Sequence, residues 1–200
     1  MPPPRSNLLM DFLVPSHAVA APLLTTDSRK AARFIPQARG SLWTGRLETP
    51  SLAPFVASPD EVILVMLRRA ELKAGELLYD LGSGDGRILV AAARDFGANA
   101  VGVELDEERA QESLQKVRQL GLQDKVWVIQ GDFMNVDVSD ADVITAYLTE
   151  QGNEILRPKL ERELKPGARV VSHNFELRGW TPKSIAEVDW HRVYVYENAE

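Results

Sequence analysis

A glycine-rich segment between a predicted strand and a predicted helix carries the clearest chemical signal in the chain. It reads Asp80-Leu-Gly-Ser-Gly-Asp-Gly-Arg87. Glycine permits a tight turn and lets the backbone approach a ligand closely. The N-terminus of the following helix adds free N–H groups and a partial positive charge. The segment therefore predicts a site for a ligand that carries a carboxylate or a phosphate.

Two acidic residues follow the next two predicted strands. Glu104 ends the second strand, 18 residues after Gly86, where a carboxylate can accept hydrogen bonds from both hydroxyls of a ribose. Asp132 follows the third strand beside Phe133, and this pair suits the amino group and the ring of an adenine. Each acid, taken alone, could also be a solvated residue that caps the end of its strand. Because ligands of open α/β sheets bind at the carboxyl ends of strands, the signals together indicate an adenosine ligand.

Asp80 decides which adenosine ligand the segment suits. The G-x-G-x-x-G pattern of dinucleotide sites fails because Arg87 stands where its last glycine should be, and the Gly-Lys-Ser/Thr ending of a P-loop is absent. An aspartate before the turn would repel a pyrophosphate, whereas it attracts an ammonium group. The sequence therefore predicts S-adenosylmethionine (SAM), which has an amino acid at one end and adenosine at the other.

Alternating strands and helices must position these residues. Ser58-Pro59-Asp60-Glu61 predicts a helix start with Ser58 as the N-cap. Strands are expected at 76–80, 100–104, 126–130, 142–147 and 169–172, with helices near 87–96, 107–120 and 150–164 between them. This alternation implies an α/β fold with a parallel sheet between helices. The last two strand-like runs, 185–190 and 192–197, are expected to form an antiparallel hairpin.

Over roughly residues 54–197 the chain resembles the class I SAM-dependent methyltransferases. In that superfamily a Rossmann-like, doubly wound sheet has seven strands, mostly parallel, and the last strand runs antiparallel between two parallel ones. The expected hairpin agrees with this. The resemblance implies that the following residues hold the cofactor: Asp80, Gly82, Ser83, Gly84, Glu104, Leu105, Asp132 and Phe133.

A narrower resemblance is to the ATP synthase c-subunit lysine methyltransferases and the broad-specificity archaeal protein lysine methyltransferases. The motifs that carry it are Pro54–Pro59, Asp80–Arg87, Gly102–Asp106, Tyr147-Leu148, Arg157–Leu160 and Val170–Phe175 with Gly179-Trp180. The pre-helix motif of that group usually reads Pro-Tyr/Phe-Val-Pro-Thr-Pro, and this chain has Ala57 and Ser58 at its fourth and fifth positions. The resemblance implies transfer of methyl groups to lysine side chains of proteins. The superfamily resemblance also implies that Tyr147, a candidate catalytic residue, touches both cofactor and substrate. The alternative is a buried tyrosine at the end of its strand.

Other residues are candidates for the substrate side. Thr149 and Glu150 could attract a cationic side chain or simply cap a helix. His173, after the fifth strand, could take a proton or have a structural role. Phe55 could form part of a lid or belong to the core. Trp190 is expected to pack. Alternative functions are a small-molecule or RNA methyltransferase and a non-catalytic SAM binder.

Composition limits the classes of function. The net charge of -6, from 23 Lys+Arg against 29 Asp+Glu, argues against a broad grip on nucleic acid and fits a protein partner with an accessible lysine. There is no cysteine and the three histidines lie far apart, so no metal site is predicted. No apolar run approaches the ~20 residues that a membrane span needs.

The first 50 residues differ from the rest, because they are rich in proline and net positive. We expect residues 1–50 to form an irregular arm or lid, and residues 51–200 to form the methyltransferase domain. A secretory signal is one alternative for the arm, since Ala18-Val19-Ala20 resembles a cleavage site, although Asp11 and Pro15 interrupt the apolar stretch before it. An organelle transit peptide, which is typically rich in arginine and poor in acids, is the other alternative. A cytoplasmic location is the default expectation.

Overall fold

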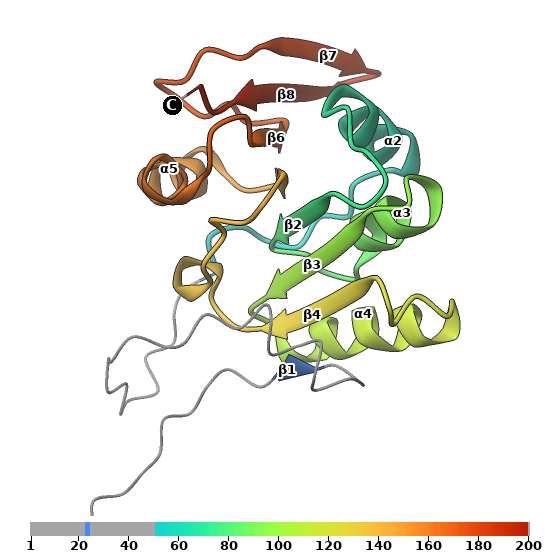
Figure 1. Ribbon diagram of the computed structural model, residues 1–200. Helices are drawn as coiled ribbons and strands as arrows, with labels where there is room; N and C mark the ends of the chain where they lie inside the picture. Colours follow the sequence, from blue (N-terminus) through green and yellow to red (C-terminus); the bar gives the residue numbers. More distant parts are fainter. Residues whose placement is uncertain (1–22, 25–50, 200) are drawn as a thin grey trace, which may run out of the picture.

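The computed structural model describes residues 23–24 and 51–199 (Figure 1). Its strands are β1 (Leu23–Leu24), β2 (Leu77–Leu81), β3 (Asn99–Glu104), β4 (Val126–Gln130), β5 (Val143–Ala146), β6 (Arg169–His173), β7 (Ser184–Val188) and β8 (His191–Glu197). Its helices are α2 (Asp60–Arg69), α3 (Arg87–Asp95), α4 (Glu107–Gln119), α5 (Glu150–Glu163) and the short 3-10 helix η1 (Phe133–Asn135). The strands and helices expected from the sequence within 51–199 are present, with ends that differ by at most two residues.

One sheet, in the order β1-β4-β3-β2-β5-β6-β8-β7, runs through the molecule. Strands β2 to β6 pair in parallel, whereas β8 lies antiparallel between β6 and β7. This confirms the seven-stranded, mostly parallel sheet with an antiparallel C-terminal hairpin. The two-residue strand β1 adds an antiparallel edge beside β4 (Figure 1).

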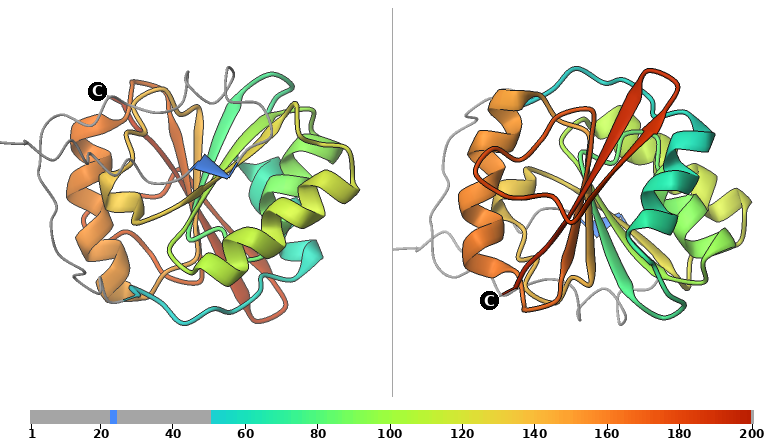
Figure 2. Two further views of the ribbon diagram at one scale, coloured as in Figure 1. Left: turned by 90° about the horizontal axis from the view of Figure 1, so that it is seen from below. Right: turned by 90° about the horizontal axis from the view of Figure 1, so that it is seen from above.

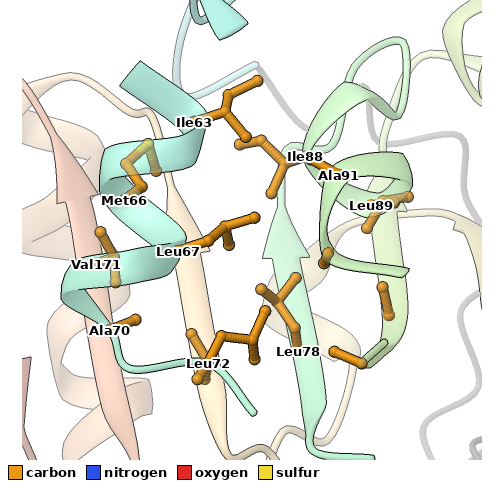
Figure 3. Close-up of a cluster of buried hydrophobic side chains, with 14 of the residues drawn as sticks. Ile63, Met66, Leu67, Ala70, Leu72, Leu78, Ile88, Leu89, Ala91 and Val171 are labelled. Atoms are coloured by element: carbon orange, nitrogen blue, oxygen red, sulfur yellow. The ribbon is translucent and has the colours of Figure 1, made fainter. Parts of the chain in front are cut away.

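Helices cover both faces of the sheet (Figure 2). α2, α3 and α4 lie on one face, and α5 lies on the other with η1. The apolar residues of α2 recur at helical spacing, so one side of the helix is buried: Val62, Ile63, Met66 and Leu67. Figure 3 shows side chains of this face packed toward Leu78 of β2 and toward α3. This packing fixes α2, and with it the segment that precedes it, against the sheet.

The start of α2 differs from the sequence prediction. Pro59 is the N-cap residue, and it makes no side-chain cap hydrogen bond. Ser58, the predicted cap, is buried, and its Oγ lies 2.9 Å from Nδ1 of His173 at the end of β6. The hydroxyl is therefore bonded across the fold, and the acids Asp60 and Glu61 in the first turn complement the helix dipole instead.

The hairpin brings a second correction. Trp190 is 75% exposed rather than packed in the core, although its ring lies 3.5 Å from that of His191. The arm and the targeting segment predicted for residues 1–50 lie outside the described residues, except for Leu23 and Leu24. Within the described part of the chain, no helix has the length and apolar character needed to cross a membrane.

Candidate active site

A cavity of about 680 Å³ opens at the carboxyl ends of β2 to β5. That volume lies within the range of about 300–1,000 Å³ that is typical of small-molecule sites. Nearly all the residues predicted from the sequence line it: Asp80, Gly82, Ser83, Glu104, Leu105, Asp132, Phe133 and Tyr147. Gly84 is the predicted residue that is not among them. The fold thus brings together side chains from four strand ends.

Residues 51–58, which we call the strap, also line the cavity. Figure 2 shows the strap passing from the α5 side of the sheet to α2. Its first part is held by Thr149, whose hydroxyl donates to the carbonyl of Leu52 at 2.9 Å. Its last residue is held by Arg87, whose Nη1 donates to the carbonyl of Ser58 at 3.0 Å. The strap is therefore tied to the domain on both sides of the cavity.

Phe55 of the strap covers the glycine turn. A Cβ atom added to Gly84 would lie 2.4 Å from the Phe55 ring, and the φ of Gly84 is +52°. The guanidinium of Arg109 lies 3.8 Å from the centre of the same ring, which is a cation–π contact. The close approach of the ring to the backbone supports the expectation that Phe55 is part of a lid.

Asp80 is a buried carboxyl at the floor of the cavity, with 3% of its surface exposed. Thr145 of β5 donates a hydrogen bond of 2.8 Å to its Oδ1. Burial raises the pKa of Asp80 to about 7, and the nearby carboxylates of Glu104 and Asp85 add to the increase, whereas the Thr145 hydrogen bond opposes it. A cationic ligand group beside Asp80 would relieve this penalty.

Glu104 holds the glycine turn in place. Its Oε2 accepts from the amide of Gly84 at 2.7 Å, and its Oε1 accepts from the amide of Asp106 at 2.9 Å. Two backbone donors therefore fix the carboxylate at the cavity wall, where its remaining lone pairs could accept from ribose hydroxyls. Asp132 caps η1 by accepting from the amide of Met134 at 2.8 Å, as the cap alternative predicted, and it also lines the cavity.

Tyr147 lies directly after β5 at the cavity wall. Its ring centre is 3.9 Å from that of His173, and its hydroxyl accepts a hydrogen bond of 3.0 Å from Nδ2 of Asn174. Thr149 is the N-cap of α5, and exposed Glu150 pairs with Arg178 at 2.7 Å. Thr149 is therefore a helix cap, which was the structural alternative to attracting a cationic side chain.

Sequence reasoning missed Asp85 and Thr145. Asp85 pairs with Arg87 at 2.9 Å and with Lys116 at 2.8 Å. Burial alone would raise its pKa, but these two cations outweigh it and lower the pKa to about 2. A fixed negative charge therefore anchors the glycine turn to α3 and α4. The signal for Thr145 was a lone hydroxyl in the otherwise apolar strand Val143–Ala146.

Two features of the cavity fit SAM. Oγ of Ser83 is buried at the wall and has no hydrogen-bond partner among the described residues, so it is available to a polar ligand. The ionisable lining residues are mostly acidic: Asp80, Asp85, Glu104, Asp106 and Asp132 against Arg87 and Arg109. That balance suits a cationic ligand. No group of three or more His, Asp or Glu side chains in the described residues could hold a metal ion.

Comparisons with known proteins agree with this geometry. A protein-lysine N-methyltransferase of Saccharolobus islandicus is 46% identical over 148 residues, which cover 72% of this chain and 92% of that protein. The model of the ANTKMT methyltransferase domain matches residues 80–184. The chain belongs to the ANTKMT methyltransferase domain family. It is a SAM-dependent methyltransferase, and the predicted class and cofactor are confirmed.

Two further relatives extend the family likeness. The human ATP synthase c-subunit lysine N-methyltransferase is 29% identical over 192 residues, covering 96% of this chain and 73% of that protein. The crystal structure of an RNA methyltransferase from Salinibacter ruber in complex with S-adenosyl-L-homocysteine has a TM-score of 0.71 and 39% identity. It covers 72% of this chain and 95% of that one. When bound, SAM supplies a methyl group on a positively charged sulfur; this chain's residues bind and orient the reactants.

Proposed function

We propose that this methyltransferase transfers methyl groups from SAM to lysine side chains of proteins. The observation that carries the proposal is the 46% identity to a protein-lysine N-methyltransferase across 92% of that protein's length. The human relative is named for lysine methylation of ATP synthase subunit c, which supports the same acceptor group. A protein substrate also fits the acidic lining of the cavity, which attracts a cationic side chain.

The chemical requirement is a neutral amine held in line with the methyl group. A lysine with its ordinary pKa of ~10.4 costs ~4.6 kcal/mol to neutralise at pH 7. The strap contributes apolar surface at the cavity through Phe55, Val56 and Ala57, and apolar surroundings disfavour the charged ammonium form. Tyr147, directly after β5, also lines the cavity and offers a phenol oxygen that would orient the amine.

We extend the sequence-based assignment of the cofactor by adding specific roles for Ser83 and Leu105. Asp80 would face the ammonium group of SAM, Ser83 its carboxylate, and Glu104 the ribose hydroxyls. Asp132 and Phe133 would contact the adenine, with Leu105 beside it. The support is that each of these residues lines the same cavity.

RNA is the second candidate acceptor, because the Salinibacter ruber protein is described as an RNA methyltransferase and is 39% identical. The charge of the cavity favours protein. A polyanionic substrate would approach a cavity lined by two arginines and five carboxyl groups, and the carboxyl groups include Asp80, Glu104 and Asp132. Such an approach is electrostatically unfavourable unless basic groups outside the cavity compensate.

The test is a transfer assay with methyl-labelled SAM and a cell lysate freed of small molecules. We expect label in material that protease destroys and ribonuclease leaves intact. Asp80→Asn is the matched negative variant, since it keeps the shape of the side chain and removes its charge. Label that ribonuclease removes would instead make RNA the substrate. Absence of label despite calorimetric binding of SAM would contradict both acceptors.

A further inference from the structure

A chain of hydrogen-bonding groups leads from the cavity wall into the interior of the fold. Ser58 of the strap lines the cavity, and its Oγ lies 2.9 Å from Nδ1 of His173. Nε2 of His173 lies 2.8 Å from Nδ1 of His191 on β8. The three residues are 4%, 0% and 4% exposed, so the protein shields the hydrogen bonds between them from solvent.

Asn174 fixes the direction of these hydrogen bonds. The backbone amide of Arg192 donates to its side-chain oxygen at 2.9 Å. A backbone N–H can only donate, so the oxygen of Asn174 must face it. The amide nitrogen therefore points the other way, toward the Tyr147 hydroxyl at 3.0 Å and toward Nδ1 of His191 at 3.5 Å.

The direction of each hydrogen bond between Ser58, His173 and His191 follows from the orientation of the Asn174 amide. An Asn174 amide N–H faces Nδ1 of His191 at 3.5 Å, so this nitrogen is the acceptor and the ring carries its hydrogen on Nε2. His173 must then donate through its own Nε2, which leaves its Nδ1 as an acceptor. The remaining partner of that acceptor is the hydroxyl of Ser58, which therefore donates its hydrogen into the interior.

The His173 ring must be neutral for this pattern to hold. Burial, with a smaller contribution from the neighbouring His191, lowers the pKa of His173 to about 4. The other titratable group in contact with His173 is Tyr147, whose ring lies 3.9 Å away. His173 therefore remains neutral throughout the physiological range, and its tautomer is set by its partners.

We propose that Ser58 Oγ is the hydrogen-bond acceptor that positions the incoming amine, because Asn174 and the two histidines direct its hydrogen away from the cavity. With that hydrogen committed, only lone pairs of Ser58 face the substrate side. An amine nucleophile can donate an N–H to this oxygen while its own lone pair stays free to attack. The inference rests on the proposed function, and it makes His173 a positioning residue rather than a base.

The backbone of the strap supports this assignment. Arg87 donates to the carbonyl of Ser58 at 3.0 Å, and the same guanidinium is held by Asp85 at 2.9 Å. Ser58 is thus fixed by its main chain as well as by its side chain. This explains why a serine before Pro59 leaves the helix uncapped: its hydroxyl has a partner on β6.

The first test reads the tautomers directly, without turnover. Nitrogen-15 NMR of the histidine-labelled full chain between pH 6.5 and 9 should show His173 protonated on Nε2. His191→Gln assigns the signals. A His173 ring protonated on Nδ1 would turn the Ser58 hydrogen toward the cavity and overturn the proposal.

The second test measures transfer to a lysine peptide and SAM binding separately. Ser58→Ala should lower kcat/KM for the peptide at least tenfold while the dissociation constant for SAM changes less than twofold. Ser58→Thr, which keeps the hydroxyl, should recover most of the loss, as a purely steric role would not. A tenfold loss of SAM affinity in Ser58→Ala would place Ser58 on the cofactor side and contradict the proposal. If the unmodified enzyme fails to methylate lysine, the proposed function fails, whereas the tautomer result stands by itself.

Discussion

The hydroxyl of Thr145 donates a hydrogen bond of 2.8 Å to the carboxylate of Asp80, and the two residues are direct neighbours in the register of β5 and β2. The sheet itself therefore places a polar partner on that carboxylate. A single hydroxyl does not offset the loss of water around a buried acid, so Asp80 is held at a pKa of about 7. Two predictions depend on this raised pKa.

SAM binding should depend on pH through Asp80. The ammonium group of SAM favours the ionised carboxyl, so a protonated Asp80 must lose its proton when SAM binds. With a pKa of about 7, affinity should rise roughly tenfold between pH 5.5 and 7, below the ~7.7–8.0 range where an α-amine loses its own proton. Calorimetry over that range measures it. In Asp80→Asn the rise should vanish, and a flat profile in the unmodified protein would contradict the assignment.

Asp80 should also limit the stability of the free protein. Its pKa is raised on folding, so the folded state favours the protonated form. Its contribution to the free energy of unfolding is most favourable when the pH is below 3.8, the ordinary pKa of the group. That contribution is lost as the pH rises through the folded-state pKa of about 7. Asp80→Asn should therefore raise Tm at pH 8, by roughly 2–4 °C for each kcal/mol recovered, and change it little at pH 4. An equal Tm at pH 8 would mean that the carboxyl is better solvated than its 3% exposure indicates.

Removal of the Glu104 carboxylate should weaken SAM binding. Glu104→Ala loses the proposed ribose acceptor and releases the amide of Gly84, which Glu104 holds at 2.7 Å. We expect affinity to fall at least tenfold, or about 1.4 kcal/mol. Glu108→Gln on the exposed side of α4 is the matched control and should bind SAM normally. A Glu104→Ala protein within twofold of the original would show that the ribose lies elsewhere.

A methyl group at Gly84 should disrupt the turn beneath the strap. Gly84 and Gly121 both have positive φ, at +52° and +68°, so alanine at either position costs about 1–2 kcal/mol of strain. At Gly121 the added carbon would make no new contact within 4 Å with the described residues, so the position is open, whereas Gly84 would meet the ring of Phe55. Gly84→Ala should therefore lose SAM affinity and Gly121→Ala should not. Adding Phe55→Ala to Gly84→Ala should recover part of the loss, and equal effects of the two alanines would argue against the close contact.

Local pattern was sufficient for much of the fold and for most of the residues that line the cavity. Apolar runs placed the strands, and the segment from Asp80 to Arg87 marked the cavity because its turn and its acids are adjacent in sequence. The contacts it could not reveal are long-range. Ser58 matches a helix cap locally, but its partner His173 is 115 positions away. The contact of Trp190 with His191 is different, because it joins sequence neighbours. What the sequence could not reveal there is that the hairpin leaves the Trp190 ring exposed beside a buried histidine.

The most direct test of the central claim is to ask whether the methyl group is carried by a lysine nitrogen. The purified full chain is incubated with methyl-labelled SAM and an acceptor protein extract, half of which has had its lysine amines chemically acetylated beforehand. Amino-acid analysis of the acid hydrolysate should recover the label as methyl-lysine from the untreated half and almost none from the acetylated half. Label that is equal in both halves, or that is recovered in another residue or in nucleotides, would contradict the lysine methyltransferase account.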